Sequence, residues 1–127
     1  MSWQSEYDAV LADLARERAP AIAAAERLFA ERRYAEADEI VVAADSSIFG
    51  AVALGRLYQA HLERLVAAGE VEADRAHAED VFRRGLAWAQ SAYPEPHTGI
   101  EAESYASGRA DDRARLVRVL GYDPDER

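Results

Sequence analysis

Alanine fills 28 of the 127 positions, whereas threonine occurs once, at Thr98, and asparagine and lysine are absent. Alanine has the highest helix propensity of all residues, and few of the other residues favour strands. The chain has little from which to build a sheet, so we expect an all-α fold. It contains no cysteine, and a chain of this length buries a core without a disulfide.

Apolar residues recur at helical spacing in about seven segments. The expected helices cover residues 2–18, 20–32, 34–44, 49–69, 72–93, 98–108 and 111–120. Pro20 favours the first position of the second helix, because proline lacks the N–H that would go unpaired there. The run from Asp45 to Ser47 is typical of a cap for the next helix. Gly69 and Gly121 favour the left-handed conformation that follows a helix end.

Short turns between successive helices predict antiparallel hairpins. No low-complexity linker divides the chain, so we expect a single domain over residues 1–127. Within it we expect a packing helix at 1–18, hairpins at 20–93 and a C-terminal helical hairpin at 97–122.

The composition excludes several classes of function. The net charge of −9 disfavours nucleic acid and anionic membranes and favours a basic protein partner. No apolar stretch is long enough for a signal or a membrane span, so we expect a cytoplasmic protein. Arg113 and Arg115 have aspartates nearby in the sequence, which predicts local ion pairs rather than a phosphate site. The chain has no lysine or cysteine nucleophile and no phosphate-binding loop, so we expect neither an enzyme nor a cofactor.

Two stretches carry a pattern of small and large residues. The first is Tyr34-x-x-Ala37-x-x-x-Val41-x-x-Ala44, with Ala25 upstream, and the second joins Ala51-x-x-Leu54-Gly55-x-x-Tyr58 to Ala78-x-x-x-Phe82-x-x-Gly85. This pattern resembles the tetratricopeptide repeat, a helical hairpin about 34 residues long. The second stretch is about eleven residues too long for that repeat, and the first is about one helical turn short. The alternative is an irregular helical bundle, in which alanine at helical spacing reflects close packing.

The resemblance implies a binding module that holds a peptide or a partner helix in an apolar groove, on the face made by the first helix of each pair. Carried over to this chain, the partner-binding residues are Ile22, Glu26, Phe29, Phe49, Val52, Arg56 and Gln59. The lysine and asparagine with which some family members bind a terminal carboxylate are absent. The alternative for Phe29, Phe49 and Val52 is a place in the core.

Two other classes of function stay open. Trp88 lies on a second apolar stripe of its helix, which suggests a homodimer with a structural role whose interface contains Trp3, Trp88 and Tyr93. Tyr58, His61 and His97, together with the proline-stiffened loop 93–99, are candidates for binding a small ligand or for proton transfer. His77 has Asp74 and Asp80 three residues to either side. A single such cluster is typical of a solvated helix face, so we expect no metal site.

Overall fold

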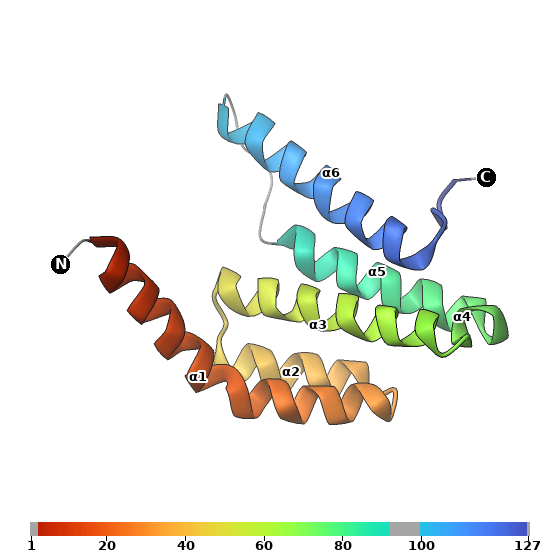
Figure 1. The fold of residues 1–127 in the computed structure, drawn as a ribbon, viewed down its shortest axis with the longest axis horizontal. Coiled ribbons are helices and arrows are strands. Elements are labelled where there is room, and N and C mark those ends of the chain that lie inside the picture. The colour runs from red at the N-terminus through yellow and green to blue at the C-terminus, as the bar shows by residue number, and fades with distance from the viewer. Residues whose placement is uncertain (1–2, 92–99, 127) are drawn as a thin grey trace. The chain divides into compact units, whose positions relative to one another are not determined.

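The structure, a computed structural model, describes residues 3–91 and 100–126. Throughout these ranges every regular element is a helix, as expected (Figure 1). The helices are α1 (Trp3–Ala30), α2 (Tyr34–Ala44), α3 (Ile48–Ala67), α4 (Glu70–Ala73), α5 (Arg75–Ser91) and α6 (Ile100–Leu120). The expected capping box that starts at Thr98 lies outside the described residues.

The chain groups into two compact units. Unit 1 contains residues 1–50 and unit 2 contains residues 51–127. α1 and α2 belong to unit 1, α4 to α6 belong to unit 2, and α3 begins in the last residues of unit 1. The division falls inside α3, whereas we expected a single domain with internal boundaries near residues 18–20 and 97.

Pro20 lies inside α1 and does not begin a helix. The predicted break at residues 18–20 is therefore wrong. Proline costs a helix one hydrogen bond, here the bond to the Arg16 carbonyl, and bends it. The red first part of α1 and its orange last part run in different directions (Figure 1). Alanine, arginine and glutamate on both sides of Pro20 are strong helix formers, and they carry the helix through the bend.

The core of unit 1 lies between α2 and the last part of α1. Its buried residues are Ala25, Phe29, Tyr34, Ala37 and Val41. The rings of Phe29 and Tyr34 meet edge to face, with their centroids 5.2 Å apart. At the other end of α2, Arg18 Nη1 lies 3.2 Å from Asp45 Oδ2, and both side chains are largely buried. The red first part of α1, before this ion pair, runs away from α2 (Figure 1).

α1 is followed by an arginine in the left-handed backbone conformation. Arg32 has φ +60°, and the amides of Arg32 and Arg33 donate to the carbonyls of Phe29 and Leu28. This is the Schellman arrangement, in which glycine is the favoured residue. Arg32→Gly should therefore raise the free energy of unfolding, by about 0.5–1 kcal/mol, because it removes the strain of a side chain at positive φ. Urea denaturation measures the change.

Arg33→Gly is the matched control for that prediction, because Arg33 has φ −98° and its guanidinium bonds to Glu36. Glycine at position 33 relieves no strain and should lower stability. Equal effects of the two variants, in either direction, would contradict the prediction.

Unit 2 is built on close packing of α5 against α3 and α6 (Figure 1). A Cβ built on Gly85 of α5 would lie 2.8 Å from the Cβ of Tyr58 on α3 and 3.9 Å from Leu116 Cδ1 on α6. Large side chains fill the space around this contact. The fully or almost fully buried ones are Leu54, Tyr58, Leu62, Val81, Phe82 and Leu116.

The ends of the helices in unit 2 match the expected signals in part. Gly69 and Gly121 have positive φ, as predicted. Asp74 separates α4 from α5, and its Oδ1 accepts a hydrogen bond from the His77 amide. α6 runs without a break from Ile100 to Leu120, so the expected helical hairpin at 97–122 is wrong. The alanines and arginines around Gly108 continue the helix through that glycine.

Candidate functional site

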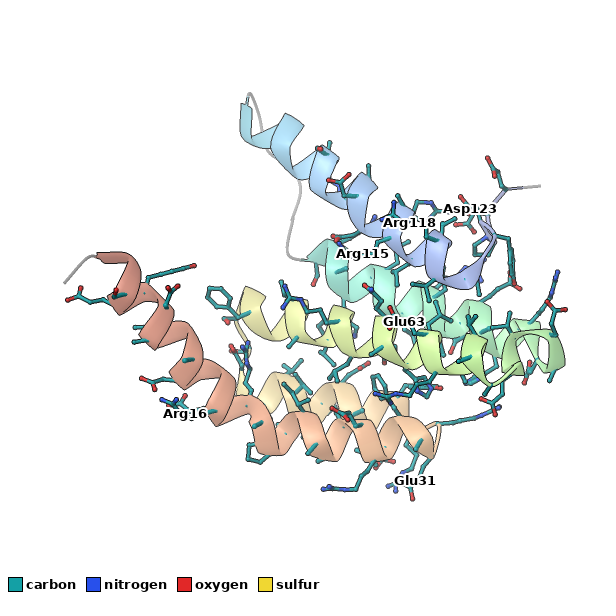
Figure 2. All side chains as sticks on the ribbon, viewed as in Figure 1. Arg16, Glu31, Glu63, Arg115, Arg118 and Asp123 are labelled. Atoms are coloured by element: carbon teal, nitrogen blue, oxygen red, sulfur yellow. The ribbon has the colours of Figure 1, made fainter. Side chains whose placement is uncertain are left out.

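An open groove of about 460 Å³ lies on unit 2. Its lining comes from one face of α3, from one residue of α5 and from two residues of α6. The lining residues are Val52, Gly55, Arg56, Gln59, Ala60, Glu63, Ala89, Asp112 and Arg115. Figure 2 labels Glu63 on α3 and Arg115 on α6, which lie on opposite walls of the groove.

Small residues explain why the groove is hollow. A Cβ built on Gly55 would lie 3.2 Å from both Cα and Cβ of Ala89, so α3 and α5 approach closely here. Gly55, Ala60 and Ala89 have too little side chain to fill the space above this contact. The groove is thus a consequence of the same small residues that bring the two helices together.

A chain of hydrogen bonds joins the two walls. Arg115 Nε donates to Gln59 Oε1 at 2.9 Å, and Gln59 Nε2 donates to Glu63 Oε1 at 3.2 Å. On α6, Arg115 Nη2 bonds to Asp112 Oδ1. Asp112 is 8% exposed, and its guanidinium partner balances its charge. The groove is therefore half polar, whereas we expected an apolar one.

Two charges in the groove have no ion partner among the described residues. The Arg56 guanidinium is exposed and forms no ion pair or hydrogen bond there, and Glu63 accepts only the bond from the neutral Gln59 amide. The groove therefore offers a cation and an anion on the same helix.

The groove contains three of the seven residues expected to bind a partner, namely Val52, Arg56 and Gln59. Ile22, Glu26 and Phe49 belong to unit 1 and do not line it. Phe29 is 1% exposed and packs on Tyr34, so it is a core residue, as the alternative held.

Six of the lining residues were not predicted. Ala60 and Glu63 follow Arg56 by four and seven residues, so the helical spacing of α3 could have found them. Gly55 belongs to the repeat-like pattern, which does not place it among the partner-binding residues. No spacing in the sequence predicts that Ala89, Asp112 and Arg115 lie beside α3, because these residues belong to other helices.

Two of the three candidates for a small-ligand site, Tyr58 and His61, lie on α3. Tyr58 is fully buried and His61 is 8% exposed, and neither lines the groove. His97 and the loop 93–99 lie outside the described residues. Of the candidate dimer contacts, Trp88 is half-buried in α5, Trp3 begins α1 without a described side chain, and Tyr93 lies outside.

The cluster around His77 has local roles. Asp74 caps α5, and Asp80 Oδ2 accepts a hydrogen bond from Arg84 at 2.9 Å. Among the residues that the structure describes, no three histidine or carboxylate side chains are grouped as metal ligands would be.

The turn after α6 is held by ion pairs, as the sequence predicted for Arg113. Arg113 Nη2 bonds to Asp123 Oδ1 and to Asp125 Oδ2, and Arg83 Nη2 lies 3.1 Å from Asp125 Oδ1. The hydrogen bonds from Arg83 and then from Arg113 lower the pKa of Asp125 below its ordinary value. These contacts tie the C-terminal turn to α5 and α6.

The lowered pKa of Asp125 makes this turn sensitive to acid. Its stabilisation is fully present above the pKa of an unfolded aspartate, about 3.9, and is lost as the pH falls through the lower folded value. We therefore expect the amide NMR signals of Tyr122, Asp123, Asp125 and Glu126 to move toward unfolded positions below about pH 4. Asp125→Asn should produce much of this change already at pH 7, and identical acid titrations of the two proteins would contradict the assignment.

Comparison of the chain with protein-family models, curated proteins and solved structures found no match. Over the described ranges, no helix has both the length and the apolar character that a membrane crossing requires.

Proposed function

We propose that this chain is a protein interaction module and that the groove of unit 2 binds a short peptide segment of a partner. The observation that carries the proposal is the groove itself, a hollow that the described side chains leave unfilled and that is lined by both polar and small apolar groups. Such a lining orients a ligand through its polar groups and excludes water at its floor. The proposal gives the chain no catalytic role.

The resemblance to the tetratricopeptide repeat supports this proposal. It implies that the first helix of a pair presents the binding face, and α3 is the first helix of the pair that it forms with α5. The quoted residues Gly55, Tyr58 and Gly85 are buried where these helices meet. An irregular bundle would also bury them, so their burial does not distinguish the two folds.

Affinity capture from cell extract tests the proposal with three baits. They are the wild type, Arg56→Glu in the groove, and Arg64→Glu as the control, because Arg64 is exposed on α3 but does not line the groove. We expect a specific protein to be captured by the wild type and Arg64→Glu and lost with Arg56→Glu. Its equal capture by all three, or its loss with both variants, would contradict the groove as the binding site.

One observation favours a second candidate, the structural homodimer. Tyr7 and Val10, on the first part of α1, are 50% and 55% exposed, and they share an apolar stripe with Trp3. Two copies that pair along this stripe would cover it. Light scattering should then give a dimer for the wild type and for Ala12→Glu, on another face of α1, and a monomer for Val10→Glu. A wild-type monomer at all concentrations excludes this candidate.

A further inference from the structure

The two groove charges that have no ion partner in the described part of the chain lie a fixed distance apart. Arg56 and Glu63 are seven residues apart on α3, which is close to two helical turns and about 10 Å along its axis. Between them lie Gln59 and Ala60, and the Asp112–Arg115 pair on the opposite wall is already neutral. An occupant therefore meets a cation, a small neutral stretch and an anion in that order.

The hollow is small for a helix. A helical segment that spans the distance from Arg56 to Glu63 is about 10–12 Å wide with its side chains and takes up on the order of 1,000 Å³. The groove holds about 460 Å³, and the bond from Arg115 to Gln59 already crosses it. The polar wall also suits an extended segment, because such a segment has unpaired backbone N–H and C=O groups to satisfy. An extended peptide is the occupant that both observations favour.

An extended polyproline-type segment repeats every three residues and rises about 3.1 Å per residue. Its side chains at positions i and i+3 therefore point the same way and lie about 9 Å apart. This spacing matches that of Arg56 and Glu63.

We propose, on the basis of the function proposed above, that the groove selects an extended segment with one acidic and one basic side chain three positions apart, separated by two small residues. The acidic side chain pairs with Arg56 and the basic one with Glu63, and the small residues lie over Gln59 and Ala60. The partner's motif is thus of mixed charge, whereas the chain's net charge of −9 alone favours a basic one.

Capped octapeptides test the inference, because acetyl and amide ends remove the terminal charges. The core Glu-Ala-Ala-Arg, in glycine and serine flanks, is titrated into the ¹⁵N-labelled protein, and the groove amides are followed by NMR. Cores with one, three or four alanines between the charges test the spacing. Glu-Ala-Ala-Glu and Arg-Ala-Ala-Arg test the signs of the charges.

We expect the Glu-Ala-Ala-Arg core to bind best to the wild type and about five- to tenfold more weakly when one protein charge is reversed. Arg56→Glu should then prefer Arg-Ala-Ala-Arg, and Glu63→Arg should prefer Glu-Ala-Ala-Glu. The double reversal exchanges the two charges, so it should prefer the reversed core Arg-Ala-Ala-Glu, and Arg64→Glu should leave the order of binding unchanged. Equal binding of all cores, or preferences that do not follow the reversals, would overturn the inference.

A random library of capped octapeptides separates this inference from the function on which it rests. Selected peptides that move the groove amides but share no charge pattern would overturn the charge rule and leave the interaction module standing. If neither the library nor the mixed core moves these amides, the proposed function and the inference both fail.

Discussion

Gly85→Ala is expected to lower the free energy of unfolding by about 1–3 kcal/mol, as overpacked cores do. The added Cβ would lie 2.8 Å from the Cβ of Tyr58, so α3 and α5 must move apart. Helix propensity alone predicts the opposite sign, a gain of about 1 kcal/mol when alanine replaces glycine inside a helix. The sign measured by urea denaturation therefore decides whether the two helices touch here.

Gly69→Ala is the control for this prediction. A Cβ at position 69 meets no atom within 4 Å, and its only penalty is the positive φ of +73°. We expect a loss of about 1 kcal/mol there, with no change in the NMR signals of Tyr58. Gly85→Ala should move those signals, and a stable variant with an unmoved Tyr58 would contradict the described contact.

Gly50→Ala is the second substitution with a large expected effect. A Cβ at this position would overlap the carbonyl oxygen of Asp45 and would lie 3.0 Å from its carbonyl carbon. A backbone carbonyl cannot move aside as a flexible side chain can, so the turn between α2 and α3 must change. We expect a loss of about 2–3 kcal/mol, at the upper end for an added methyl group, together with the loss of the Ser47 cap on α3.

Ser46→Ala provides the comparison for Gly50→Ala. Ser46 is exposed in the same turn, and we expect its replacement to change stability by less than about 0.5 kcal/mol. Chemical denaturation, with the amide signals of Ser47 and Phe49 as reporters of the cap, measures both variants. Equal stability of the two would show that the turn accommodates a Cβ at position 50.

Local chemistry explains which parts of the fold could be predicted. Asp45 and Ser47 cap α3 because their short side chains reach backbone amides: Asp45 Oδ1 accepts from the Ser47 amide at 2.9 Å, and Ser47 Oγ accepts from Phe49 at 3.2 Å. Gly69 and Gly121 end helices because glycine adopts positive φ without strain. Each of these signals lies within a few residues of its effect.

The helix breaks at Pro20 and Gly108 were predicted wrongly for the same reason. Proline and glycine are common at helix ends, and each is also tolerated inside a helix at a cost in stability. The local sequence does not distinguish these two situations. In α1 and α6 the flanking helix formers outweigh a single unfavourable position. Proline and glycine therefore mark where a helix is weak, and the neighbouring residues decide whether it ends.

The groove could be predicted along one helix only. Val52, Arg56 and Gln59 share a face of α3 through their spacing, which the sequence shows directly. Ala89, Asp112 and Arg115 join them because α5 and α6 pack beside α3, and that depends on contacts such as Gly85 with Tyr58. The resemblance indicated the helix that presents the face and did not indicate the residues opposite it.

Because one helical hydrogen bond is missing at Pro20, the two parts of α1 unfold separately. The residues after Pro20 are held by the core with α2, so their amide protons exchange with solvent only when unit 1 opens. The first part of α1 runs away from α2 (Figure 1), and the helical hydrogen bonds are interrupted at position 20. Although α1 is drawn as one helix, its two parts therefore differ in how their amide protons exchange with solvent. The first part can unwind and re-form while the hairpin of α1 and α2 stays folded.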